Sequence, residues 1–313
     1  MPTIDYKEQK EIRYTQNGDP SENPGNYLNA LSHDVASGNV WIWSGSGGAW
    51  YKQVDRGRVL STDPMLDVSA GVYDFQSAVN KFGKALDVDT ATETDIWDGA
   101  DGTTSTDVWV PPTIARVHNI ASTDANDASG SGTGARTVEV QGLDTNWDLQ
   151  QETVNMNGVT DVPTSGSYRR IFRMKVVTAG NLGGNAGIVT ATAVTDATVT
   201  AAIQPGNNQS LMAIYTVPNG KTAYITSYYS SFSGSTPATV SGNVRLLVKN
   251  VNASNTVFQL KHILGLIGGQ GFQHEFAPYY KVTEKHDIKL NMNDSSANNT
   301  ALTGGFDIVL VNN

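Results

Sequence analysis

Asp287-Ile-Lys-Leu-Asn-Met292 alternates polar and apolar residues along its whole length. A period of two places successive side chains on opposite faces of a β-sheet. The same alternation returns in runs that begin at Thr137, Ile171, Lys221 and Asn243, and clusters of Gly, Asn, Ser and Thr separate these runs. Many short strands with turn residues between them are typical of a β-sandwich. The sequence therefore predicts a mainly β protein, an antiparallel two-sheet sandwich of the jelly-roll type.

The predicted strands fill the chain from its middle to its end. They cover residues 138–143, 170–177, 188–193, 211–217, 223–230, 244–249, 257–263, 288–292 and 306–311, with a further candidate at 108–117. This number of strands suits one jelly roll, or two smaller sandwiches that divide near residues 204–208. We assign residues 96–313 to this β region.

Residues 1–95 differ in composition and form a predicted N-terminal arm. Segments 40–43 and 49–54 flank a Gly/Ser loop and predict a hairpin. Apolar residues recur at partly helical spacing over 65–86, which predicts a helix that Gly83 ends. The acidic stretch 87–101 would then link the arm to the sandwich.

Large aromatic side chains gather in the predicted hairpin, where Trp41, Trp43, Trp50 and Tyr51 lie close together in the sequence. An isolated hairpin cannot bury such side chains. Desolvated aromatic residues contribute much of the binding energy of protein interfaces. We therefore expect these four residues to anchor the arm on another protein surface.

Composition narrows the possible partners. The formal net charge is −9, and an acidic surface repels nucleic-acid phosphates. The chain has no cysteine, which excludes disulfides, thiolate catalysis and cysteine-based metal sites. No stretch approaches the roughly 20 apolar residues needed to cross a bilayer. We expect neither nucleic acid nor membrane as a partner.

No motif indicates catalysis. The five histidines form no HExxH motif, and His262 in an apolar run predicts a core or interface residue. Gly130-Ser-Gly-Thr-Gly-Ala-Arg136 leads into a predicted strand, whereas a phosphate-binding loop leads into a helix. Nothing places Glu284 and Asp287 across a cleft, as a glycosidase needs. We expect no enzyme activity and no cofactor.

Two acidic clusters raise the question of a cation site. They are Asp95, Asp98 and Asp101, and Asp124, Asn126 and Asp127. Neither cluster has the spacing or the closing glutamate of an EF-hand loop, so we interpret both as solvated turns and predict no metal site.

Several segments resemble a group of tailed-bacteriophage virion proteins that are common in phages of aquatic bacteria. The similar segments are Asp95-Ile-Trp-Asp-Gly, Gly132-Thr-Gly-Ala-Arg-Thr-Val-Glu-Val-Gln-Gly-Leu-Asp, Glu152-Thr-Val-Asn-Met-Asn-Gly, Tyr215-Thr-Val-Pro-Asn-Gly-Lys-Thr-Ala-Tyr-Ile and Glu284-Lys-His-Asp-Ile. They span roughly residues 90–313. The resemblance implies a structural role and transfers no active-site residue.

A capsid decoration (cement) or head-fibre protein is the leading expectation from this resemblance. Such a protein would assemble in the host cytoplasm, dock on the major capsid protein through its arm and expose its sandwich. Virion parts repeat by symmetry, so we also expect self-association, with a homotrimer favoured by analogy. The alternatives are a tail fibre, spike or tail adaptor component, and a carbohydrate-binding module that recognises host surface glycans.

Overall fold

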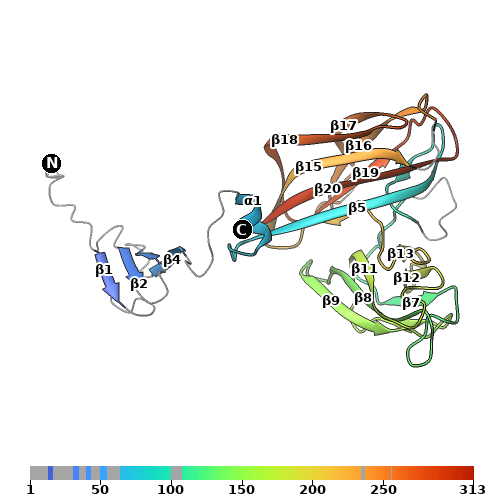
Figure 1. The fold of residues 1–313 in the computed structure, drawn as a ribbon, viewed down its shortest axis with the longest axis horizontal. Helices are drawn as coiled ribbons and strands as arrows, with labels where there is room; N and C mark the ends of the chain where they lie inside the picture. The colour runs from blue at the N-terminus through green and yellow to red at the C-terminus, as the bar shows by residue number, and fades with distance from the viewer. Residues whose placement is uncertain are drawn as a thin grey trace. The chain divides into compact units, whose positions relative to one another are not determined.

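The computed structural model describes residues 13–16, 31–34, 40–43, 50–54, 64–99, 108–233, 237–254 and 256–313. Contacts between residues divide the chain into two compact units, Met1–Asp74 and Phe75–Asn313 (Figure 1). The division falls between Asp74 and Phe75 rather than near residue 95. Among the described residues, no helix is long and apolar enough to cross a membrane.

The N-terminal unit contains a small sheet and one short helix. The sheet has the order β1 (Arg13–Gln16), β2 (Leu31–Asp34), β3 (Val40–Trp43) and β4 (Trp50–Val54). Strands β3 and β4 pair antiparallel, so the predicted hairpin is confirmed. Helix α1 (Pro64–Ser69) starts with proline, whose fixed φ suits the first helical position. Gly71 follows it with a φ of +66°, a conformation that favours glycine.

The helix predicted over 65–86 is wrong beyond α1. Residues Gln76–Val88 form a long strand, β5, which pairs along its length with β20 (Thr300–Asn312). From Lys81 to Ala85, buried residues alternate with partly exposed ones, as in a strand. Gly83 lies in mid-strand and ends no helix. Pairing with β20 therefore overrides the weak helical spacing of the apolar residues.

The larger unit contains two β-sandwiches, one inserted into the other. We call the first the parent sandwich. One of its sheets has the order β18 (Gly271–Val282), β15 (Lys221–Ser233), β20, β5. The other has the order β14 (Ile214–Thr216), β19 (His286–Met292), β16 (Ser241–Asn250), β17 (Gln259–Ile267), and β6 (Thr94–Asp95) also pairs with β19. Side chains such as Ile225, Tyr228 and Phe306 fill its core.

The inserted sandwich lies between β6 and β14 in the sequence and is drawn in green to yellow in Figure 1. One sheet has the order β10 (Val162–Pro163), β7 (His118–Ser122), β12 (Val189–Ala193), β13 (Val199–Ile203). The other has the order β11 (Arg170–Ala179), β8 (Ala135–Leu143), β9 (Leu149–Asn155). Trp97 and Met212 form a bridge where the insertion begins and ends. The buried apolar side chains form two clusters that broadly follow the two sandwiches; Leu143 and Phe172 of the inserted sandwich belong to the parent cluster, and Ile214 of β14 belongs to the inserted one.

Each of the nine strands predicted from 138–143 onward overlaps an observed strand, whereas the candidate at 108–117 contributes only the isolated bridge of Arg116 with Tyr168. The sequence prediction did not include β1, β2, β5, β6, β7, β9, β10, β13 and β18. Strands β9 and β18 are edge strands. Their exposed residues dilute the apolar pattern on which the prediction depended.

A buried ion pair joins the two sandwiches. Arg170 on β11 donates from Nε and Nη2 to the two carboxylate oxygens of Asp287 on β19, at 2.9 and 3.0 Å. The Thr216 hydroxyl donates to the same carboxylate at 2.5 Å. Both charged side chains are almost fully buried. Asp95 forms a similar buried pair with Lys289 and also accepts the backbone N–H of Trp109, which leads into the inserted sandwich.

Candidate functional site: the open side of the parent sandwich

The residues predicted as anchors lie on the paired strands of the N-terminal hairpin. Trp43 is opposite Trp50, and Tyr51 is opposite Ile42. Trp41 and Trp43 are two positions apart on β3. Trp41 is partly buried. The side chains of Trp43, Trp50 and Tyr51 lie outside the described residues, so their anchoring role stays a prediction.

The structure brings two of the five histidines together. His262 on β17 and His274 on β18 stack with ring centroids 4.0 Å apart and an interplanar angle of 21°. The Tyr228 hydroxyl lies 2.6 Å from Nδ1 of His262. Phe276 contacts both histidine rings, and Tyr280 lies 5.9 Å from Phe276. We call these five residues the edge cluster.

The edge cluster lies between the last strands of the two parent sheets. In the part of the chain that the structure describes, β17 pairs only with β16, and β18 pairs only with β15. One side of the parent sandwich is therefore bordered by two strands whose outer backbone groups have no strand partner. Such edges can accept another strand or another protein surface. The histidine stack holds the two edges together at this open side.

Apolar side chains cover the solvent face of β17. Leu264 and Leu266 pack on the core, so Ile263 and Ile267 point to the opposite face by strand alternation. Their exposed fractions are 48% and 42%. A register shift between β16 and β17 places Leu260 opposite Leu247, and Leu260 is 53% exposed. We call Leu260, Ile263 and Ile267 the apolar stripe. Several exposed aliphatic side chains on an unpaired edge strand are typical of an interaction surface.

The open side also differs in charge from the rest of the chain. Its two strands carry Lys261, Glu275 and Lys281, whereas the whole chain has a net charge of −9. A hollow of about 600 Å³ next to the edge cluster is lined by Lys261 and Lys281, and no carboxylate lines it. The open side is therefore one region of this acidic protein that a like-charged molecule can approach without strong repulsion.

Burial lowers the pKa of His262, and the neighbouring His274 lowers it further. The lowered pKa favours the neutral form of His262, the ring that stacks on His274. His118, in the inserted sandwich, is a separate case. Burial lowers its pKa to about 4, although its contact with the Arg116 carbonyl acts in the opposite direction. His118 is therefore a neutral core residue near pH 7.

The carboxylates weighed for catalysis or metal binding are occupied in structural contacts. Asp287 is bound to Arg170, and Glu284 accepts the backbone N–H of Gly220. The Asp127 carboxylate accepts hydrogen bonds from the Ser122 hydroxyl and from the backbone N–H groups of Ala135, Ala186 and Gly187. No group of three or more potential metal ligands occurs in the described ranges.

The other members of the acidic clusters are not solvated turns throughout. Asp95 is paired with Lys289, and Asp98 is buried, which raises its pKa to about 7. Asp124 accepts the backbone N–H of Asn126 in a local turn. Asp101 lies outside the described residues. The expectation of solvated turns is therefore wrong for Asp95, Asp98 and Asp127, because tertiary contacts bury them.

No short motif in the sequence marks the edge cluster. A Gly-Gly turn joins β17 to β18, but the two strands belong to different sheets and are not paired with each other. The contact of His262 with His274 therefore depends on the packing of the two sheets.

Comparison with known proteins identifies no family. No family model matches the chain, and no curated protein matches it. Among solved structures, the chain is similar to the N-terminal CBM22-1–CBM22-2 tandem domain of Xyn10C from Paenibacillus barcinonensis. The identity is 11%, the match covers 76% of this chain and 93% of that chain, and the TM-score is 0.23. A likeness of this size defines neither fold nor function.

Proposed function

We propose that this chain is a structural protein of a bacteriophage virion that assembles with copies of itself through the open side of the parent sandwich. The observation that carries the proposal is the apolar stripe on an unpaired edge strand, beside the half-buried edge cluster. The sequence resemblance to virion proteins supports the same role. Capsid decoration or a head fibre is the favoured place, and a tail component is the alternative.

A second copy of the chain is the occupant that best fits the open side. Each copy carries a net charge of −9, so two copies repel each other over most of their surfaces. The open side combines near-neutral charge with exposed aliphatic side chains. Contact there would cover the apolar stripe and the unpaired strand edges without bringing carboxylates together. In a closed homotrimer the open side of each copy would contact a different surface of the next copy, because the interfaces of a three-fold ring are heterologous.

The N-terminal hairpin would then connect the oligomer to the virion. Trp41 and Trp43 are two positions apart on β3, so strand alternation leads us to expect both on one face, where they would contact the major capsid protein or another virion component. In this arrangement the two units have different tasks: the first docks, and the second forms the oligomer and is exposed to solvent.

Replacing Ile263 with glutamate should convert the assembled protein to a monomer of 33.4 kDa. The new carboxylate would be buried unpaired in the contact, which costs several kcal/mol, so association should weaken by about a hundredfold or more. Val177 on β11 is 50% exposed in the inserted sandwich, so Val177→Glu is the matched control and should leave the mass unchanged. Size-exclusion chromatography with light scattering measures both. A wild-type protein that is monomeric at high concentration would contradict self-association.

A Trp41→Ala, Trp43→Ala double variant should be lost from virions. Truncation of one buried interface tryptophan costs about 2–4 kcal/mol, roughly a thirty- to thousandfold loss of affinity. Ile42→Ala, which alters the opposite face of the same strand, is the control. Quantitative mass spectrometry of purified particles gives the number of copies per virion. Hundreds of copies indicate a place on the head, and on the order of a dozen copies indicate a place in the tail. Normal incorporation of the double variant, together with lost binding to cell-surface glycans, would favour the carbohydrate-binding alternative.

A further inference from the structure

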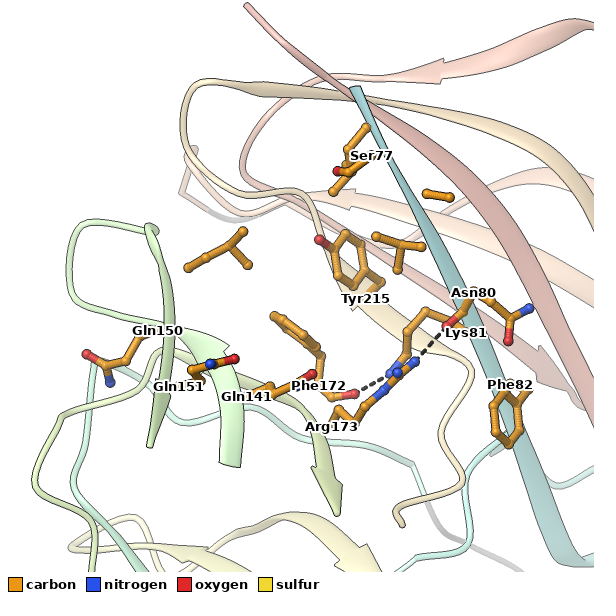
Figure 2. Close-up of a pocket in the computed structure, with 14 residues that line it drawn as sticks. Ser77, Asn80, Lys81, Phe82, Gln141, Gln150, Gln151, Phe172, Arg173 and Tyr215 are labelled. Carbon is orange, nitrogen blue, oxygen red and sulfur yellow. Dashed lines mark hydrogen bonds between the residues drawn. The ribbon is translucent and has the colours of Figure 1, made fainter. Parts of the chain in front are cut away.

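A second cavity, of about 450 Å³, lies between the parent and inserted sandwiches (Figure 2). Strand β5 forms one wall, and residues of β8, β9 and β11 form the other. The side chains that matter are Lys81, Gln141, Gln150, Phe172, Arg173 and Tyr215. Two hydrogen bonds fix the walls: Lys81 Nζ donates to the Phe172 carbonyl, and Arg173 donates to the Asn80 carbonyl at 2.7 Å.

Lys81 is a buried amine without a carboxylate. It is 2% exposed, and within the described ranges neither it nor Arg173 forms an ion pair with an acidic side chain. Burial holds the pKa of Lys81 well below its usual range, and the nearby Arg173 lowers it further. Lysine is seldom fully buried unless it is paired. An anion bound in the cavity would pair with the Arg173 guanidinium and stabilise the protonated form of Lys81.

Tyr215 provides a second, independent observation. It is 1% exposed and lines the cavity, and its hydroxyl has no hydrogen-bond partner among the described residues. The hydroxyl oxygen itself is open to the cavity, where a water molecule or a ligand can bond to it. Figure 2 shows Tyr215 above Phe172 and Lys81 at the same hollow. Its ring lies 5.0 Å from that of Phe172, so an aromatic wall stands beside a free hydroxyl group.

Amide side chains line the opposite wall of the cavity. Gln141 on β8 and Gln150 and Gln151 on β9 border it. The Gln150 amide has only a long contact of 3.4 Å with the Ser167 carbonyl. Amides can donate to and accept from hydroxyl groups at the same time. The cavity thus has a cationic end, an aromatic surface and a wall of amides.

We propose that this cavity binds an acidic sugar, one monosaccharide ring that carries a carboxylate. The carboxylate is held between Arg173 and Lys81, the hydroxyl groups bond to Tyr215 and the glutamine amides, and the ring lies against Phe172. The volume lies within the range of small-ligand sites. This site is separate from the open side and would be retained in the assembled protein.

D-glucuronate is the probe, and D-glucose is the matched neutral sugar. Isothermal titration calorimetry of the full chain should show glucuronate binding with a Kd of about 1 mM or tighter. Glucose should bind at least about tenfold more weakly, because it lacks the carboxylate and hydrogen bonds to charged groups contribute more to affinity than those between neutral groups. Equal binding of acetate and glucuronate would overturn the sugar assignment. No glucuronate binding at tens of millimolar would overturn the site.

Two substitutions separate binding from folding. Tyr215→Phe removes a hydroxyl that bonds to no described residue, so the melting temperature should stay unchanged while glucuronate affinity falls about tenfold. Lys81→Met should abolish binding and leave the melting temperature equal or higher, since it removes a buried unpaired amine. Lys84→Met, on the same strand but away from the cavity, should keep wild-type affinity. Unchanged glucuronate binding in both cavity variants would contradict the proposal.

Discussion

Replacing Arg170 with methionine should lower the free energy of unfolding by about 3–5 kcal/mol, because the substitution leaves the buried carboxylate of Asp287 without its cation. Arg170 also packs over the rings of Trp109 and Trp147, so the variant additionally loses contacts with two aromatic side chains. Urea unfolding followed by circular dichroism measures the loss. The inserted sandwich should separate from the parent sandwich at lower urea than in wild type.

Lys175→Met is the matched control, since Lys175 lies on the same strand as Arg170 and pairs with Glu139 on β8, but is 44% exposed. Exposed ion pairs contribute about 0–1 kcal/mol, so this variant should stay close to wild type. A double substitution, Arg170→Met with Asp287→Leu, should regain much of the lost stability because no unpaired charge remains buried. Equal losses in Arg170→Met and Lys175→Met would contradict the structural role of the pair.

The second large effect is expected at Gly83. A Cβ at this position would lie 2.2 Å from the Ile96 carbonyl oxygen and 2.5 Å from the Ala213 backbone nitrogen. These are backbone atoms of two other segments, which cannot move as the end of a side chain can. Gly83→Ala should therefore reach or exceed the upper end of the usual overpacking cost, about 3 kcal/mol. Thermal unfolding of the variant measures it.

Gly271→Ala is the control for Gly83. Gly271 opens β18, and a Cβ there would meet only the Cβ of Ser231, at 3.8 Å, an ordinary contact. This control should be neutral or slightly stabilising, because alanine restricts the unfolded chain. A neutral Gly83→Ala variant would indicate that β5 does not lie against Ile96 and Ala213, and would support the helix that the sequence predicted.

The candidate sites were less predictable from the sequence than the fold. His262 was expected to be a core or interface residue; the structure places it half-buried, and its partners Tyr228 and His274 come from two other strands. The cavity proposed for an acidic sugar depends on Lys81, Phe172 and Tyr215, which come from both sandwiches. None of these residues forms a motif, because their spacing in the sequence is set by unrelated strands.

The sequence by itself determined the β class, the hairpin at β3 and β4, and the approximate places of most strands of the larger unit. These features depend on local alternation and on turn residues, and both can be read within a short window. Only the tertiary structure decided that Gln76–Val88 is a strand, that one sandwich is inserted into another, and which carboxylates are buried. The pairing of Lys81 with Phe306 joins residues far apart in the sequence. Strand pairing of this kind stabilises β5 more than the weak helical preference of the same residues would stabilise a helix. Its partner strand lies far away in the sequence, so an inspection of neighbouring residues cannot reveal it.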